Sequence, residues 1–239
     1  MKTIGLIGGM SWESSAEYYR LINEATQQTL GGLHSARCIL YSVDFAEIEA
    51  LQHQNRWVEA AQMLCAAAQS LARAGADGLV LCTNTMHKLA PDIEASVSIP
   101  LLHIADATAQ QVKAQGIQRV GLLGTRFTME EAFYRDRLGD RHGLAVVIPP
   151  VSDREVVHRV IYEELCLGVI NPASRQQYRE IMARLMAAGA EGIILGCTEI
   201  ELLVQAADAA VPMFPTTRIH AEAAVAWAIA PDPSSALSP

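Results

Sequence analysis

The stretch AGADGLVLCTNT, residues 74–85, occurs a second time in this chain as AGAEGIILGCTE, residues 188–199. The two stretches match column by column and place Thr83 in the same column as Cys197. Two further matches flank them in the same order and at nearly the same spacing: IGLIG (4–8) with VGLLG (120–124), and residues 99–101 with residues 211–213. Ordered matches of this kind indicate two copies of one supersecondary unit, whose equivalent strand ends can face one ligand from two sides.

Short β-rich runs alternate with longer helical patterns, which predicts βα units built on parallel sheets. We expect four strands in each half of the chain: residues 3–7, 38–43, 78–82 and 101–103, then 120–123, 144–148, 192–196 and 213–214.

Capping residues predict where several helices begin and end. Residues 128–131, Thr-Met-Glu-Glu, have the spacing of a capping box, and their helix is expected to end near Gly143. Three more helices are expected to run from N-caps to terminal glycines: from Asn55 to Gly75, from Asp106 to Gly116, and from Asn171 to Gly189.

The composition is that of a protein with a full hydrophobic core, since 51% of the 239 residues are hydrophobic and 18% are charged. A net charge of −8 without blocks of Lys or Arg argues against nucleic acid or a membrane surface as a partner. The five cysteines are widely spaced and include no CxxC pair, so neither a disulfide framework nor a metal site is expected. Reduced thiols, a start too short for a signal peptide and no apolar run of about 20 residues predict a cytoplasmic protein.

Polar loops follow four of the predicted strands: residues 8–11, 83–85, 125–128 and 197–199. Ligands of doubly wound sheets bind at such loops, and their backbone N–H groups and hydroxyls suit an amino-acid carboxylate. The alternative is that these side chains only cap helices. The glycine-rich start lacks GxGxxG and a P-loop Lys, so neither a dinucleotide nor a triphosphate is expected.

Cys197 is the best candidate for chemistry because it lies at a strand end before a helix, where the pKa of a thiol is lowered. Cys82 is one residue out of register with it and is expected to be structural, turned to the other face of its strand. Glu199 either polarises Cys197 or lies in the first turn of the following helix only because its negative charge interacts favourably with the helix dipole. His87 is expected on a helix surface.

Four segments, IGLIGGMSWES, LCTNTMHK, LLGTRFTM and LGCTEIELL, together resemble the aspartate/glutamate racemase superfamily, and most of all its bacterial L-aspartate/glutamate-specific amino-acid racemases. The resemblance implies two pseudo-symmetric Rossmann-like α/β domains with four-stranded parallel sheets and an active site in the cleft between them. The domains are expected at residues 1–105 with a returning helix at 218–230, and at residues 106–217. Residues 231–239 are a Pro/Ser-rich tail that is expected to be disordered.

The same resemblance implies a racemase, often a homodimer, that needs neither pyridoxal phosphate nor a metal. In the family, two cysteines flank the substrate α-carbon; one removes the proton and the other returns a proton to the opposite face. The GCTE segment carries the second of these onto Cys197, which in relatives serves the L-enantiomer.

The chain departs from the family at the other face, where typical relatives have PCNTAH and this chain has CTNTMH. Thr83 therefore stands in the cysteine column, and its hydroxyl can relay a proton but is a poor base. Ile48 and Cys166 lie near the columns where aspartate-specific relatives carry basic residues, and Gln52 is the nearest polar candidate to contact a substrate side chain. A range of amino acids wider than aspartate and glutamate stays open.

We expect a racemase of a free α-amino acid in which Cys197 is the acid and base on one face, Thr83 the weaker proton relay on the other, and Glu199 a possible assistant. Two alternatives remain: a single-cysteine decarboxylase of the arylmalonate type on the same fold, and a catalytically silent amino-acid-binding protein. The predicted substrate-binding residues are Met10, Gln52, Asn84, Thr85, Thr125, Thr128 and Thr198.

Overall fold

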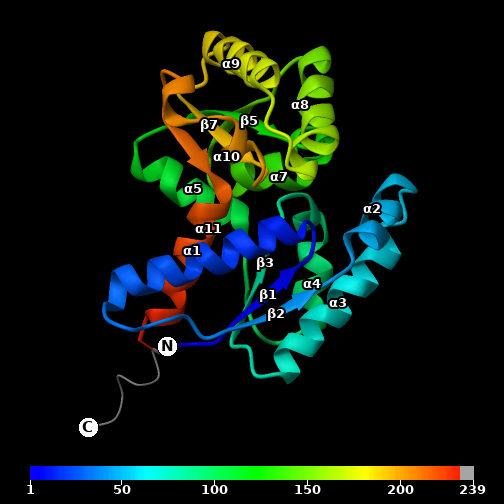
Figure 1. Ribbon diagram of the computed structural model, residues 1–239, viewed down its shortest axis with the longest axis vertical. Coiled ribbons are helices and arrows are strands. Elements are labelled where there is room, and N and C mark those ends of the chain that lie inside the picture. Colours follow the sequence, from blue (N-terminus) through cyan, green and yellow to red (C-terminus); the bar gives the residue numbers. More distant parts are fainter. Residues whose placement is uncertain (232–239) are drawn as a thin grey trace. The chain divides into compact units, whose positions relative to one another are not determined.

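The computed structural model describes residues 1–231 and contains two four-stranded parallel sheets (Figure 1). The first sheet has the order β2-β1-β3-β4, and the second has the order β6-β5-β7-β8. All eight predicted strands and the repeated α/β architecture are confirmed. The strands are β1 (Ile4–Gly8), β2 (Cys38–Ser42), β3 (Gly78–Leu81), β4 (Leu101–Leu102), β5 (Arg119–Gly124), β6 (Ala145–Val147), β7 (Gly192–Gly196) and β8 (Met213–Pro215).

The contacts between residues divide the chain into two compact units. The first consists of residues 1–80, 92–102 and the C-terminal segment from 221, and the second of residues 81–91 and 103–220. The segment after β3 thus groups with the second unit, whereas the predicted first domain included it. The predicted domain boundaries near residues 105 and 218 stay a prediction. The predicted disordered tail lies, beyond residue 231, outside the described residues.

In the first unit, the connection from β1 to β2 runs towards one edge of the sheet, and the connection from β2 to β3 runs back in the opposite direction. Right-handed crossovers therefore place α1 (Trp12–Leu30) and α3 (Trp57–Arg73) on opposite faces of the sheet. The first unit also contains α2 (Phe45–His53), most of α4 (Ala90–Ser96) and most of α11 (Thr216–Ile229), whereas the short turn η1 (Thr85–Leu89) groups with the second unit. Within residues 1–231, no helix is both long and apolar enough to cross a bilayer.

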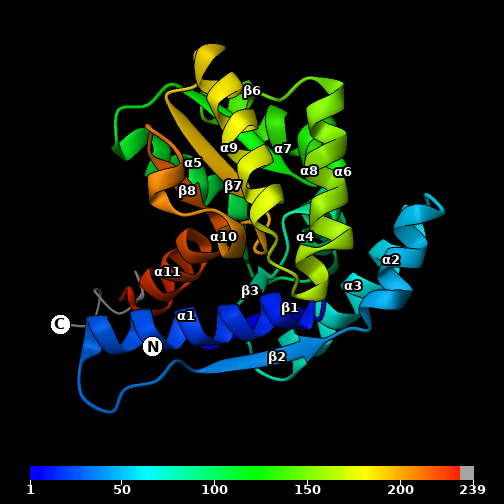
Figure 2. The ribbon, with the colours of Figure 1, turned by 45° about the horizontal axis from the view of Figure 1, so that its top comes forward.

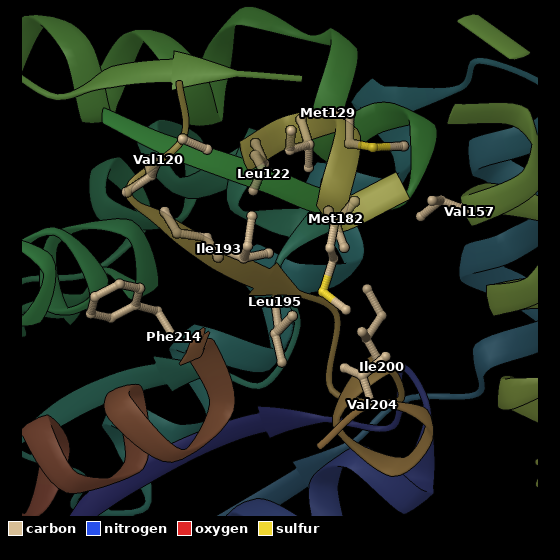
Figure 3. Close-up of a cluster of buried hydrophobic side chains, with 14 of the residues drawn as sticks. Val120, Leu122, Met129, Val157, Met182, Ile193, Leu195, Ile200, Val204 and Phe214 are labelled. Atoms are coloured by element: carbon tan, nitrogen blue, oxygen red, sulfur yellow. The ribbon is translucent and has the colours of Figure 1, made fainter. Parts of the chain in front are cut away.

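In the second unit, α8 (Val151–Glu163) and α9 (Pro172–Ala187) run side by side (Figures 1 and 2). Side chains from β5, β7 and α9 form its core, with Leu122, Ile193 and Met182 fully buried (Figure 3). Burying one such side chain contributes about 1.5–3 kcal/mol. The other helical segments are α5 (Ile104–Ala114), α6 (Arg126–Glu130), α7 (Ala132–Asp136), a π-helical turn at Arg137–Arg141, α10 (Ile200–Leu203) and short turns at Leu165–Leu167 and Ala206–Asp208.

The predicted helix ends are confirmed at the C-termini, where Gly75, Gly116, Gly143 and Gly189 all have positive φ. The single helix predicted to end near Gly143 is wrong, because Glu131 has an extended conformation and divides this stretch into α6 and α7, followed by a π-helical turn. Asn171 is confirmed as an N-cap, because its Oδ1 accepts a hydrogen bond from the N–H of Ala173.

Three predicted N-caps are wrong. Asn55 has a φ of 57° and its side chain accepts from the indole N–H of Trp57, so α3 begins one residue later, after Arg56. His103 caps α5, which leaves Asp106 in the first turn. Thr125 caps α6, so Thr128 is an interior residue and forms no capping box.

Candidate active site

The two central strands of the second sheet end side by side, since Gly124 of β5 pairs with Gly196 of β7. A Cβ on Gly196 would lie 2.8 Å from the carbonyl oxygen of Leu123, so this close approach requires glycine. The strand order reverses between β5 and β7, which makes their carboxyl ends the switch point where doubly wound sheets bind ligands. The residues that follow the two glycines are Thr125 and Cys197.

The thiol of Cys197 is half-buried and donates a hydrogen bond to Oε2 of Glu199, at 2.9 Å. Burial raises the pKa of Cys197 well above its ordinary value, and the negative charge of Glu199 raises it further. The predicted lowering of this pKa is therefore wrong. The following helix, α10, has only four residues, and its dipole does not offset burial and a neighbouring carboxylate.

Thr83 is half-buried and lies in the segment that leaves β3. The next residue, Asn84, donates through Nδ2 to Oγ1 of Thr216 at 3.0 Å, and Thr216 donates to the carbonyl oxygen of Leu195 at 2.8 Å. Leu195 stands two residues before Cys197 in β7. Two consecutive hydrogen bonds thus tie the segment that carries Thr83 to the strand that carries Cys197.

Asn84 also holds an unused acceptor. Its side chain is 4% exposed, and its Oδ1 has no hydrogen-bond partner within residues 1–231. A buried acceptor without a partner is costly, so it favours a ligand that brings an N–H group.

Three threonine hydroxyls form a second buried group. The hydroxyl oxygens of Thr85 and Thr125 are 2.9 Å apart, and that of Thr128 lies 3.2 Å from Thr125 and 3.4 Å from Thr85. Thr128 is fully buried, where its hydroxyl can order the other two.

The other predicted binding residues come from other segments of the chain. Thr198, half-buried, accepts a hydrogen bond from Thr217 at 3.1 Å. Met10 and Gln52 belong to the first compact unit, where each is 5% exposed. Sequence reasoning missed Thr216, although Thr216 and Thr217 follow β8 just as the predicted polar residues follow other strands.

His87 is 1% exposed, so its predicted position on a helix surface is wrong. Its ring lies 4.5 Å from that of His103 and 5.8 Å from that of His220, between centroids. Cys82 is fully buried, and burial raises the pKa of its thiol. In the described part of the chain, no three His, Cys, Asp or Glu side chains are grouped so as to hold a metal ion.

A thiol paired with a carboxylate, beside buried hydroxyls at the switch point of a parallel sheet, is an arrangement suited to acid–base chemistry on a small polar molecule. Residues 7–224 match the family of Asp/Glu/hydantoin racemases, and the chain belongs to this family. This confirms the family and the class of enzyme, a racemase, that the sequence predicted.

The chain is similar to several racemases over nearly its whole length. A Yersinia pestis protein, provisionally described as an Asp/Glu racemase, is 61% identical, with a TM-score of 0.91 over 96% of this chain and 100% of its own. An aspartate racemase homologue from Pyrococcus horikoshii is 34% identical, with a TM-score of 0.83 over 95% and 99% of the two chains. The broad specificity amino-acid racemase of Bacillus subtilis is 21% identical over 95% of this chain and 98% of its own.

An arylmalonate decarboxylase also shares the fold, with a TM-score of 0.53 over 96% of this chain and 94% of its own. At 14% identity, this likeness concerns the fold alone. The racemase interpretation therefore stands ahead of the decarboxylase.

Proposed function

We propose that this protein racemises free α-amino acids without a cofactor, with Cys197 moving the proton at one face of the α-carbon and Thr83 serving the other face. The observation that carries this proposal is the hydrogen bond from the Cys197 thiol to the Glu199 carboxylate. A protonated thiol is not a base, and it becomes one only when it gives up its proton. The Glu199 carboxylate is an acceptor for that proton.

The proposed reaction begins with proton transfer from Cys197 to Glu199, which yields a thiolate and a neutral carboxylic acid with no change in net charge. The positive ammonium group of the substrate favours the thiolate by its charge. The thiolate then takes the α-proton; the C–H bond breaks, an S–H bond forms, and the electron pair passes into the substrate carboxylate as an enediolate. The Thr83 hydroxyl relays a proton from solvent to the opposite face of the α-carbon, which completes inversion. Glu199 then releases its proton to solvent and becomes a carboxylate again.

Substrate binding is assigned to polar groups at the same strand ends. Oδ1 of Asn84, buried and without a partner among the described residues, suits the substrate ammonium group. The hydroxyls of Thr85, Thr125 and Thr198 suit the α-carboxylate, with Thr128 ordering the first two. Met10 and Gln52 are proposed to contact the rest of the substrate.

We propose a substrate range that includes aspartate and glutamate but is not confined to them. The half-buried Cys166 is not a cation, so it offers no positive charge to a side-chain carboxylate, and it contributes to the raised pKa of Cys197. Arg126, at the start of α6, is the nearest cation in sequence to the threonine group, and its guanidinium stacks 5.7 Å from the Phe127 ring. The Bacillus subtilis relative, named for broad specificity, supports such a range.

Incubation of the enzyme with single amino acids in deuterated water tests the proposal. L-aspartate and L-glutamate are expected to gain deuterium at the α-carbon, and neutral amino acids should react within about 100-fold of them, because no bidentate cation selects the side chain. Mass spectrometry measures the deuterium, and chiral chromatography measures inversion.

Two outcomes contradict parts of this proposal. Reaction with acidic amino acids alone would disprove the broad range and point to Arg126 as the selecting cation. No exchange with any amino acid, together with binding by calorimetry, would establish the silent binding protein instead.

Glu199→Gln is expected to change the pH dependence of α-proton exchange from L-substrate. In the wild type, proton transfer stays within the Cys197–Glu199 pair, so the rate is flat across neutral pH. The variant has no acceptor, and loss of the negative charge lets the pKa of Cys197 fall towards its ordinary value of about 8.5. Its rate should be low near neutrality and rise about tenfold per pH unit as the thiol ionises.

Glu201→Gln is the matched control, since it removes the same charge two residues further along and should keep the flat profile. Identical profiles for the wild type and Glu199→Gln would show that Glu199 does not accept the thiol proton.

We also propose that the protein is a cytoplasmic homodimer, as the family resemblance implies. Its cysteines are free thiols within the described residues, which suits a reducing compartment. Trp12 and Tyr19 of α1 and Leu40 of the edge strand β2 are exposed apolar side chains that a second copy can cover.

A further inference from the structure

We propose that His87 is a positioning residue that holds Thr83 in place for proton transfer at its face of the substrate. The inference rests on the proposed role of Thr83. It concerns a side chain that touches neither the thiol nor the three-threonine group in the hydrogen bonds described above, yet is among the most deeply buried polar groups of the second unit.

The two nitrogens of His87 connect two segments that leave neighbouring strands. Nδ1 lies 2.7 Å from the carbonyl oxygen of Thr83, which follows β3. Nε2 accepts a hydrogen bond from the N–H of Ile104, the first residue of α5, which follows β4. Because β3 and β4 are adjacent in the first sheet, His87 joins their two carboxyl-end segments through one rigid ring.

These partners fix one form of the ring. Since the N–H of Ile104 is a donor, Nε2 must hold a lone pair, and the proton of the neutral imidazole must be on Nδ1. Nδ1–H therefore donates to Thr83. Burial and the neighbouring rings of His103 and His220 keep the pKa of His87 well below its ordinary value, so the ring is neutral across the working pH range.

This geometry separates positioning from proton relay. The His87 proton is bound to the backbone carbonyl of Thr83, so it is not available to the Thr83 hydroxyl. The Thr83 N–H is also held, by the carbonyl oxygen of Leu81 at 2.9 Å. With both backbone groups of Thr83 bonded, the position of its Cα and the direction of its Cα–Cβ bond depend on the His87 ring. An error of about 1 Å in such a position can cost about 100-fold in rate.

Asparagine and glutamine side chains can each replace one of the two ring nitrogens of His87. The amide nitrogen of asparagine occupies the position of Nδ1, so His87→Asn keeps the donor to Thr83 and loses the acceptor for Ile104. The amide of glutamine reaches the position of Nε2, so His87→Gln keeps the acceptor and loses the donor. Each variant loses one hydrogen bond of the two, which makes them a pair matched for stability.

The experiment measures racemisation and L-substrate α-proton exchange in the same reaction. His87→Gln is expected to lower the ratio of racemisation to exchange about tenfold, because the Thr83 face is displaced while Cys197 still exchanges the proton at near wild-type rate. His87→Asn should keep the wild-type ratio within about threefold. His103→Asn removes another buried ring of the cluster but keeps a cap for α5, and it should leave the ratio unchanged.

Hydrogen exchange at the Thr83 amide, followed by NMR, gives a readout that does not need activity. His87→Gln should weaken its protection about tenfold or more while His87→Asn keeps it. If both variants leave the ratio and the Thr83 protection unchanged, the inference about His87 is overturned. If the protection changes as expected but the wild type neither exchanges nor racemises any amino acid, His87 does position the segment and the proposed function is what fails.

Discussion

Cys197→Ser is expected to lower both α-proton exchange and racemisation at least 100-fold, because loss of a general base costs 10²–10⁴-fold. A serine hydroxyl does not give up its proton to Glu199 near neutral pH, so no base forms on this face. The substrate should still bind, since the groups assigned to its ammonium and carboxylate are on other residues. Deuterium incorporation measures the loss, and calorimetry with L-aspartate measures the binding.

Cys38→Ser is the control for loss of a thiol. Cys38 is half-buried in β2 of the first unit and has no assigned role, so this variant should keep wild-type exchange. Retention of more than about a tenth of the wild-type rate in Cys197→Ser would exclude Cys197 as the base.

The strands and the repeat could be predicted because both signals are local. Alternating β-rich and helical runs identify strands residue by residue, and the match of residues 74–85 with 188–199 predicted the equivalent strands β3 and β7. The positive φ of Gly75 and Gly189 is local for the same reason, since a helix that ends in the left-handed region favours glycine whatever packs around it.

The predictions that were wrong concern features that depend on tertiary contacts. His103 caps α5 because its Nδ1 accepts a hydrogen bond from the N–H of Ala105, whereas Asp106 pairs with Arg137, 31 residues away. Burial of His87 beside two other rings is likewise a property of packing. The pKa of Cys197 was predicted from its position before a helix, but burial and Glu199 decide its direction.

The asymmetry between the two faces has a thermodynamic consequence. Racemisation has an equilibrium constant of one, so kcat/KM must be equal for the two enantiomers under the same conditions. A Thr83 hydroxyl that cannot take a proton from D-substrate is, by microscopic reversibility, an equally poor donor in forming it. Abstraction and return by Cys197 alone exchanges hydrogen without inverting the centre.

Thr83→Cys is therefore expected to raise racemisation relative to L-substrate exchange by about tenfold or more, because a thiol has an ordinary pKa of about 8.5 and can ionise where the hydroxyl cannot. The wild type should exchange the α-proton of L-substrate faster than it inverts it, and should exchange D-substrate slowly. Thr83→Ser keeps a hydroxyl at the same position and should show no such gain. Parallel measurements of deuterium uptake and chirality from each enantiomer give the ratio. Equal wild-type exchange for L and D, with no gain in Thr83→Cys, would mean that a group other than Thr83 already carries the proton at the second face, because only an ionisable group there makes the two faces kinetically equivalent.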